Sequence, residues 1–352
     1  MSTPGHGTPE RRSFGHGDGR ILLGHGSGGR LTASLFHDVF LPAFRNPALE
    51  AAGDQAVLSL AGTRLAVTTD SFVVSPLFFP GGDIGRLAVC GTVNDLAVGG
   101  ATPACLTAGF IIEEGFPAED LRKVVASMAE AAREAVVEIV AGDTKVVERG
   151  KGDGLFITTT GVGLVPDGLR LGPGEIRPGD QILVSGHVGD HGVAVMVHRA
   201  GLEPGGTLRS DSAPLTGLAQ ALLQAGPGAV RCMRDPTRGG LATTLAELAA
   251  ASGTCFQVDE AEIPVRDEVR ALCEMLGLDP LYAANEGKLV AVVDPRAATA
   301  VLEAARSHPL GREARWIGQA VEGAPSEVRL RTVVGGTRPL DLLEGEQLPR
   351  IC

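Results

Sequence analysis

The sequence has few aromatic residues, little positive charge and no long uninterrupted apolar run. Aromatic residues make up only 4% of its 352 positions and apolar residues 44%, which predicts cores built from alanine, valine and leucine. The formal net charge of −11 argues against nucleic acid or an anionic membrane as a partner, because both require basic surfaces. Every strongly apolar stretch is broken well before the roughly 20 residues that a membrane span requires.

The six cysteines form no CxxC pair and show no zinc-ligand spacing. Residues 1–20 are rich in glycine and histidine and carry no apolar core, so they are expected to be a disordered tail and not a secretory signal. Without such a signal, the cysteines of a chain this long are expected to be reduced thiols of a cytoplasmic protein. Five lie in apolar stretches typical of cores. The sixth, Cys352, is the last residue and requires its own explanation.

The length predicts two domains, and the 49 glycines and 22 prolines are typical of a loop-rich enzyme. Strict βαβ alternation and sequence repeats are missing, so we expect an α+β fold with domains at 21–174 and 175–340 and a mobile tail at 341–352. The Gly/Pro-rich residues 171–180 mark the expected boundary. Periodicity predicts helices at 31–44, 81–99, 117–136, 190–200, 215–224, 239–251, 266–276 and 295–307, longer strands at 64–74, 104–112, 137–141, 155–165, 181–185, 229–234 and 289–293, and short strands near 256, 316 and 328.

Several acids lie beside glycines or at the ends of predicted strands. A carboxylate in an apolar strand is costly to bury unless it is paired, hydrogen-bonded or bound to metal. Each acid alone is typical of a turn or helix cap, and Asp83 is the expected N-cap of the helix at 81–99. Together they favour binding of magnesium and phosphate. The four acids are Asp70, Asp95 beside Asn94, Asp143 near Lys145, and Asp235.

Two glycine-rich loops precede predicted helices, GHGSGG at 24–29 and DPTRGG at 235–240. Successive unshielded N–H groups in such loops can hold phosphate oxygens. Neither loop fits the Rossmann or Walker pattern, so neither dinucleotide nor P-loop binding is predicted. An ordinary flexible turn is an equal alternative for the first loop, whereas the second also carries Arg238.

The chain ends in PRIC, with Cys352 as the terminal residue. A thiol at the end of a flexible tail is expected to be solvent-accessible and available as a nucleophile. Arg350 should favour its thiolate and the terminal carboxylate should oppose it. Prenylation is excluded because that reaction requires three residues after the cysteine. A terminal residue without a role is the remaining alternative.

Taken together, these motifs resemble the HypE family of hydrogenase maturation proteins, in the superfamily of aminoimidazole ribonucleotide synthetase and selenophosphate synthetase. The resemblance runs from about residue 25 to the C-terminus. Among the matching strings, GDTKVV and the terminal PRIC are specific to the family, whereas DPTRGG is shared more widely. The matching strings are GHGSGG (24–29), TTDSFVVSPLFFPGGDIG (68–85), CGTVNDLAVGGA (90–101), GDTKVVERG (142–150), SGHVGDHG (185–192), RDPTRGGL (234–241), ANEGKLV (284–290) and PRIC (349–352).

This resemblance implies a two-domain α+β subunit, like that of aminoimidazole ribonucleotide synthetase, whose N-terminal domains pair in a homodimer with ATP bound near the interface. It also implies that a carbamoyltransferase, HypF, loads Cys352 with a carbamoyl group. The enzyme would then use ATP to dehydrate that group to a cyano group. A scaffold complex of HypC and HypD would accept the cyanide for the iron centre of [NiFe]-hydrogenase.

The resemblance also assigns roles to single residues. The alternative for Glu286 is an ion pair with a neighbour such as Lys288. His187 and His191 are also expected near the site, with less support than the acids. Rival functions are selenophosphate synthesis, purine synthesis and a carrier that only presents the thiol. The implied catalytic residues are Cys352, Lys145 and Glu286, the implied Mg²⁺ ligands are Asp70, Asp95 and Asp235, and the implied ATP-binding residues are Gly28, Gly29, Asp70, Asp83, Asn94, Asp95, Asp143, Thr237 and Arg238.

Overall fold

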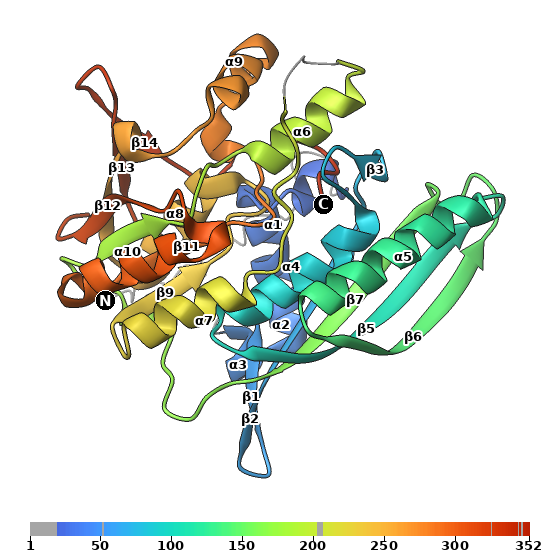
Figure 1. Ribbon diagram of the computed structural model, residues 1–352, viewed down its shortest axis with the longest axis horizontal. Coiled ribbons are helices and arrows are strands. Elements are labelled where there is room, and N and C mark those ends of the chain that lie inside the picture. Colours follow the sequence, from blue (N-terminus) through green and yellow to red (C-terminus); the bar gives the residue numbers. More distant parts are fainter. Residues whose placement is uncertain (1–19, 51–52, 203–206, 325, 344, 346–347) are drawn as a thin grey trace, which may run out of the picture.

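A computed structural model describes residues 20–50, 53–202, 207–324, 326–343, 345 and 348–352. The predicted disordered segment at 1–20 lies almost entirely outside the described residues. The α+β class is confirmed, because two mixed sheets each pack against helices (Figure 1). No helix in the described ranges is long and apolar enough to cross a membrane.

The first domain contains a five-stranded sheet in the order β1-β2-β7-β5-β6, in which only the β5–β6 pair is parallel. Helices α4 and α5 cover one face of this sheet (Figure 1). Asp83 caps α4 as predicted, since its carboxylate accepts hydrogen bonds from the N–H groups of Gly85 and Arg86. The elements are β1 (Ala56–Leu60), β2 (Thr63–Phe72), β3 (Phe78–Phe79), β4 (Gly82–Asp83), α4 (Ile84–Val98), β5 (Thr102–Glu113), α5 (Ala118–Glu134), β6 (Glu138–Val147) and β7 (Leu155–Leu164).

Strand β6 is longer than the sequence indicates. We expected a strand at 137–141 that ends at Gly142, but the strand continues to Val147 in parallel register with β5. Gly142 does not end it; a Cβ there would lie 2.4 Å from the carbonyl oxygen of Ala108, so glycine lets the two backbones approach. Nearly all of β6 is exposed at the outer edge of the sheet (Figure 1).

The second domain contains a seven-stranded sheet in the order β14-β13-β10-β12-β8-β11-β9. Helix α8 packs on one face through Leu241 and Leu245, and helices α7 and α10 pack on the other through Leu218, Leu222 and Val301. The elements are β8 (Gln181–Val184), α6 (Asp190–Arg199), α7 (Thr216–Ala225), β9 (Val230–Arg234), α8 (Gly240–Ser252), β10 (Cys255–Asp259), α9 (Asp267–Leu276), β11 (Val290–Val293), α10 (Ala298–Ser307), β12 (Arg315–Val321), β13 (Val328–Arg331) and β14 (Thr337–Leu340).

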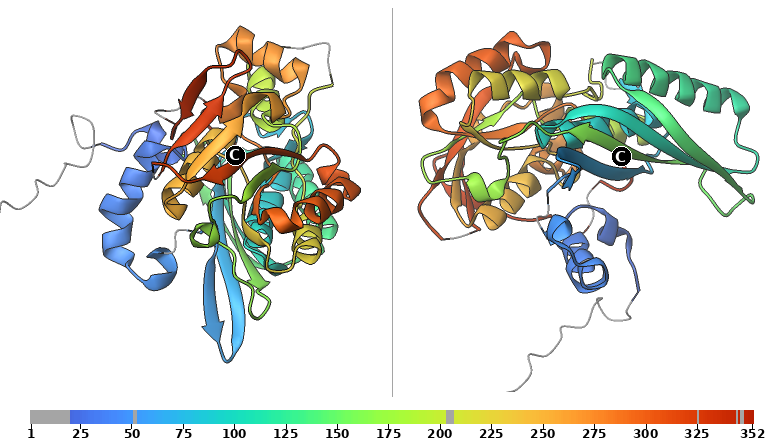
Figure 2. Two further views of the ribbon diagram at one scale, coloured as in Figure 1. Left: turned by 90° about the vertical axis from the view of Figure 1, so that its left-hand side faces the viewer. Right: turned by 90° about the horizontal axis from the view of Figure 1, so that it is seen from below.

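The N-terminal helical segment stands to one side of both sheets (Figure 2). The expected helix at 31–44 is present as α1 (Arg30–Leu35), a π-helical turn (Phe36–Phe40) and α2 (Leu41–Phe44), followed by α3 (Pro47–Glu50). Its apolar side chains Val39 and Phe40 remain 42% and 44% exposed. This segment therefore contributes little to either core of the subunit.

Candidate active site

Three carboxylates from three separate segments meet between the two domains. Asp54 precedes β1, Asp95 lies on α4 and Asp235 directly follows β9. One carboxylate oxygen of each residue lies within 4.8 Å of one from each of the other two. The hydroxyl of Thr68 donates a 2.7 Å hydrogen bond to Asp95. Because Asp235 comes from the second domain, the packing of the two domains assembles this acid cluster.

The electrostatics of the acid cluster favour a bound cation. Burial raises the pKa of Asp95 well above its usual range, and the neighbouring carboxylates of Asp70, Asp235 and Asp54 raise it further. Burial, followed by the charge of Asp54, raises the pKa of Asp235 to about 8. A divalent cation would offset both the desolvation and the mutual repulsion. A hard ion such as Mg²⁺ suits this set of oxygen ligands.

Asp54 completes this cluster and was not among the expected metal ligands. Burial raises its pKa and Arg234 opposes the shift, with 2.7 Å between the Asp54 and Arg234 side chains. Asp70 lies beside the cluster, and burial raises the pKa of its carboxyl while Arg238 opposes the shift. The sequence signal for Asp54 was available, because it follows Gly53 just as Asp143 follows Gly142. Its role as a ligand, like that of Asp70, stays a prediction.

The terminal cysteine lies inside the same site. Cys352 is half-buried and lines a small cavity together with Asp70, Asp235, Arg238 and Glu286. The structure therefore shows the thiol docked in a cavity and partly exposed, and its free accessibility on a mobile tail stays a prediction. Burial raises the pKa of the Cys352 thiol to about 12, and the opposing cation is Arg238. At neutral pH the docked thiol is protonated.

Arg350, which was expected to favour the thiolate, points elsewhere. Its guanidinium forms an ion pair with Asp153, lies 6.0 Å from the ring centre of Phe156, and donates to the carbonyl of Val73 at 2.8 Å. The tail lies beside residues 73–75, and Arg350 itself stands in a turn with φ +52°. Its charge is therefore used to dock the tail.

Glu286 is a buried carboxyl that forms no direct ion pair among the described residues. Its side chain is 2% exposed, and its Oε1 atom has no hydrogen-bond partner among the described residues. Burial raises its pKa well above the usual range, and Asp235 and Asp211 raise it further. Lys288 is 2.9 Å from Asp211, which also accepts the Glu286 N–H. Lys288 thus holds Asp211, and the expected alternative of a Glu286–Lys288 ion pair is wrong.

Asn94 links the two domains at the edge of this site. Its amide nitrogen donates to the carbonyls of Ala213 and Glu286, each at 3.1 Å, and its oxygen accepts the N–H of Leu215 at 2.8 Å. All three of these hydrogen bonds go to backbone groups of the second domain. Asn94 therefore positions the backbone that carries Glu286, and its expected contact with nucleotide stays a prediction.

The first glycine loop packs against the second loop and the tail. Gly28 has φ +83°, and a Cβ there would lie 2.9 Å from the Cβ of Arg238. A Cβ on Gly29 would lie 2.2 Å from the carbonyl oxygen of Leu343. Arg238 donates to the carbonyl of Gly26 at 2.8 Å. This loop and Cys352 line a cavity of about 190 Å³, and Thr237 lines the smaller one beside it.

Lys145 and Asp143 lie apart from this group. Both belong to the exposed strand β6, and they pair with each other at 2.5 Å with side chains 70% and 69% exposed. Lys145 lowers the pKa of Asp143. Neither residue lines the two cavities that Cys352 lines. Within one subunit, Asp143 and Lys145 therefore lie outside the two cavities beside Cys352.

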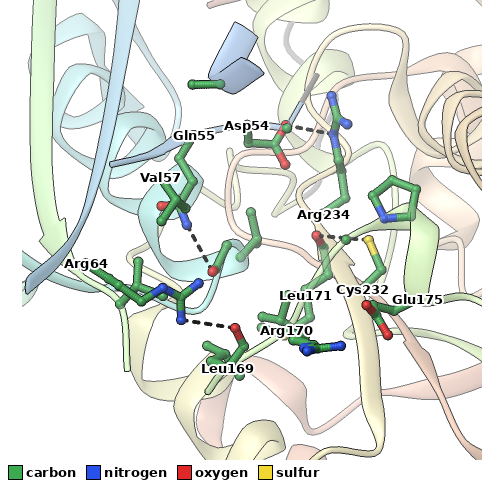
Figure 3. Close-up of a pocket in the computed structure, with 18 of the residues that line it drawn as sticks. Asp54, Gln55, Val57, Arg64, Leu169, Arg170, Leu171, Glu175, Cys232 and Arg234 are labelled. Atoms are coloured by element: carbon green, nitrogen blue, oxygen red, sulfur yellow. Dashed lines mark hydrogen bonds and ion pairs between the residues drawn. The ribbon is translucent and has the colours of Figure 1, made fainter. Parts of the chain in front are cut away.

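A larger cavity of about 710 Å³ adjoins the acid cluster from the other side (Figure 3). Asp54 and Arg234 form its boundary with the cluster, and Gln55 and Arg64 are held by backbone carbonyls of Gly99 and Leu169. Its other walls are largely apolar, so the acid cluster has open space on this side as well as on the side of Cys352.

The fold and site place the chain in a known class of two-domain enzymes. A family model described as AIR synthase related protein, N-terminal domain, matches residues 52–165, and the corresponding C-terminal domain matches residues 177–331. Together they cover more than half of the chain. The chain belongs to the AIR synthase related family.

Comparison with individual relatives narrows the class. The chain is 58% identical over 335 residues, 95% of each chain, to the carbamoyl dehydratase HypE of Cupriavidus necator. A crystal structure of a HypE–HypF complex aligns with TM-score 0.83 at 48% identity, covering 88% of this chain and 100% of that one. A crystal structure of HypE in complex with ATP aligns with TM-score 0.80 at 48% identity, covering 95% and 100%. Within the larger class, the chain is a member of the HypE family of hydrogenase maturation proteins, as its motifs predicted.

Proposed function

We propose that this protein uses ATP to dehydrate a carbamoyl group on Cys352 to a cyano group, which becomes a cyanide ligand of the [NiFe]-hydrogenase iron. The observation that carries the proposal is the position of the terminal thiol. Cys352 lies in one cavity with a protonatable carboxyl, Glu286, and with the acids next to the Asp54–Asp95–Asp235 cluster. A carrier that only presented its thiol to partners would have no use for this placement.

The chemistry requires two steps because hydroxide is a poor leaving group. Transfer of a phosphoryl group from ATP to the carbamoyl oxygen, with loss of one of the two nitrogen protons, forms a C–O–P linkage and releases ADP. Loss of the remaining nitrogen proton and cleavage of the C–O bond then leave S–C≡N and phosphate. The first step requires charge neutralisation and the second requires a base at the nitrogen.

Glu286 is the best-placed group for the proton step. Its carboxyl is buried, has a raised pKa and keeps an oxygen without a partner. Once ionised, a carboxyl with a raised pKa is a stronger base than an exposed glutamate, which suits removal of a nitrogen proton. The Asp211 carboxylate holds its backbone N–H at 3.0 Å and so fixes the origin of the side chain. Arg238 supplies positive charge beside both Cys352 and Glu286.

The acid cluster fits a magnesium site. Asp54, Asp95 and Asp235 would hold the ion, with Asp70 adjacent, and the glycine loop with Arg238 and Thr237 would face the phosphates. Bound Mg²⁺ would neutralise phosphate charge during transfer. Asp83 and Asn94 already bond to backbone groups, so their contribution to ATP binding would be indirect.

Loading of the thiol fits a different position of the tail. With a pKa of about 12, the docked Cys352 holds its proton and is a weak nucleophile. We therefore expect the carbamoyltransferase HypF to load Cys352 while the tail is withdrawn, and a HypC–HypD complex to accept the cyanide in the same state. The crystallised HypE–HypF complex of a relative supports the first partnership.

The proposed homodimer uses the exposed edge of the first domain. Ile139, Val140 and Val146 on β6 are 39%, 58% and 66% exposed, a run of apolar side chains on an edge strand. Lys145 and Asp143 lie on the same strand and would be at the interface. Lys145 would then lie closer to the Cys352 site of the partner subunit than to the site of its own subunit.

Intact-protein mass spectrometry tests the function. Protein loaded with a carbamoyl group and then given MgATP should lose the mass of one water, and ADP should form in equal amount. Unloaded protein is the control and should form little ADP. Retention of the carbamoyl mass with no ADP would leave only the carrier function. ADP that forms only when selenide or a purine precursor is added would favour the rival enzymes.

A further inference from the structure

The guanidinium of Arg199 binds two backbone carbonyls at the end of the chain. The Arg199 guanidinium donates to the carbonyl of Pro349 at 2.6 Å and to that of Arg350 at 2.7 Å. Its Nε donates to the carbonyl of Ser75 at 2.7 Å. The Ser75 N–H in turn donates to the Arg350 carbonyl at 3.1 Å. A planar guanidinium with fixed donor directions suits such a set of acceptors, and a lysine would not reproduce it.

The next two carbonyls are held in the same way. His191 Nε2 lies 3.0 Å from the carbonyl oxygen of Ile351, and its Nδ1 lies 2.8 Å from the hydroxyl of Ser210. Burial lowers the pKa of His191, so a neutral ring donates to Ile351 and accepts from Ser210. The N–H of Val73 donates to the carbonyl of Cys352 at 3.1 Å. Each of the last four residues therefore has its carbonyl paired with the body of the protein.

One apolar side chain fixes the register of these contacts. Ile351 is 3% exposed and packs in the core of the first domain with Val195 and Ala284. A slip of the tail by one residue would remove Ile351 from this core and move the thiol by about 3.3 Å. The hydrogen bonds go to backbone carbonyls, which every residue has, so they do not select one register. The burial of Ile351 therefore determines which residue lies at each position.

Both tail-binding side chains come from helix α6 (Asp190–Arg199), which also contacts the segment that carries Glu286. The N–H of Gly192 donates to the carbonyl of Ala284 at 3.0 Å, and a Cβ on Gly192 would lie 2.8 Å from the Ala284 nitrogen. The glycine lets the helix approach this closely. A change in how α6 holds the tail would therefore change the distance from Cys352 to Glu286.

We propose that Arg199 and His191 form a clamp that positions the loaded cysteine against Glu286. The inference rests on the proposed dehydration at Cys352 and deepens it, because the clamp sets the register in which the carbamoyl group reaches the site. Arg199 and His191 are positioning residues, since their contacts are with tail carbonyls and not with the reacting atoms. A displacement of about 1 Å at the reacting group can cost roughly a hundredfold in rate.

The first test measures docking without any catalysis. Arg199→Ala, Arg199→Lys and His191→Ala are treated with a thiol-alkylating reagent, and labelling of Cys352 is followed by mass spectrometry of the C-terminal peptide. The matched control is His198→Ala, an exposed histidine on the same helix. Arg199→Ala should label about tenfold faster than the parent protein because the docked fraction falls. His191→Ala should show a smaller increase, Arg199→Lys an intermediate one, and His198→Ala none.

The second test measures dehydration of the same proteins after loading. At saturating ATP, Arg199→Ala should convert carbamoyl to cyano about tenfold to a hundredfold more slowly, with the ATP concentration for half-maximal rate unchanged. The melting temperature of each variant reports any loss of folding. Arg199→Lys should recover part of the rate, which a general loss of stability would not explain.

The two readouts must change together. Faster labelling with an unchanged dehydration rate, slower dehydration with unchanged labelling, or parental values in both would each overturn the clamp. Failure of the parent protein to dehydrate a loaded Cys352 would overturn the proposed function instead. In that case the labelling comparison alone decides whether Arg199 and His191 hold the tail.

Discussion

The site around Cys352 and the outer edge strand β6 hold their charged residues in opposite ways. In the site, burial and like charges raise the pKa values of Asp95, Asp235 and Glu286. On β6, Asp143 and Lys145 are exposed and paired, and the pKa of Asp143 is lowered. The buried acids are poised to bind a cation or hold a proton, whereas the exposed pair is satisfied by itself. One subunit therefore contains most of the site. Asp143 and Lys145 on β6 can contribute only if a second subunit places its own β6 next to Cys352.

The largest effect is expected from Cys352→Ala. This change removes the thiol proposed to carry the carbamoyl group and should abolish every carbamoyl or cyano adduct. The side chain is half-buried at the chain end, so the free energy of unfolding should change by about 1 kcal/mol or less. Mass spectrometry and thermal unfolding check both points. An adduct on Cys90, Cys105, Cys232, Cys255 or Cys273 would sink the assignment.

The next largest effect is expected from Glu286→Gln. The amide keeps the size of the side chain but cannot take a proton, so loading should proceed while dehydration slows by about a hundredfold or more. Quench-flow mass spectrometry of loaded protein measures this rate. Glu274→Gln, an exposed glutamate on α9, is the control. Conversion at the parental rate would remove Glu286 from the proton step.

A subunit-mixing experiment sharpens the comparison between the site and β6. Lys145→Ala should slow dehydration by about tenfold or more with little change in stability, because exposed ion pairs contribute about 0–1 kcal/mol. Dimers that combine Lys145→Ala with Glu286→Gln subunits would contain one intact site only if Lys145 acts across the interface. Recovery of activity on mixing is the expected result. No recovery would place Lys145 and Glu286 in the same subunit's site.

The smallest effect is a pH dependence of stability in metal-free buffer. The pKa of Asp235 is raised from 3.8 to about 8, so folding favours its protonated form. Its contribution to stability is present below pH 3.8 and is lost as pH rises through about 8. Asp235→Asn should therefore melt about 1 to 3 °C higher than the parent at pH 8.5, with a smaller difference at pH 5.

Added MgATP provides the control for that experiment. It should raise the melting temperature of the parent protein and should raise that of Asp235→Asn much less, since the variant lacks a proposed ligand. Equal stabilisation of both proteins by MgATP would show that Asp235 is not a ligand of the metal and has only a structural role. A parent protein with the same pH profile as the variant would contradict the raised pKa.

Much of the fold was predictable because it depends on local pattern. The apolar spacing of residues 118–134 and the alternation in residues 155–164 indicated α5 and β7 with nearly correct ends. The outer strands were harder to recognise. Strand β1 was missed and β6 was predicted too short, because exposed edge strands lack the alternation of buried and exposed residues.

The sequence by itself determined the kinds of residue that the chemistry requires, namely acids beside glycines, two glycine loops and a terminal cysteine. It could not determine which of them meet. Asp54 joins Asp95 and Asp235 only because the two domains pack together. Lys288 pairs with Asp211, and the Oε1 atom of Glu286 keeps no hydrogen-bond partner among the described residues.

The tertiary structure also decided where the tail lies. A polar terminal segment predicted mobility, yet its last residues find acceptor and donor partners on α6 and residues 73–75. Mobility of residues 341–352 at other stages stays a prediction. Short-range sterics and periodicity act along the chain and can be read from it. Contacts between segments more than a hundred residues apart depend on how two domains pack, and no local pattern encodes that.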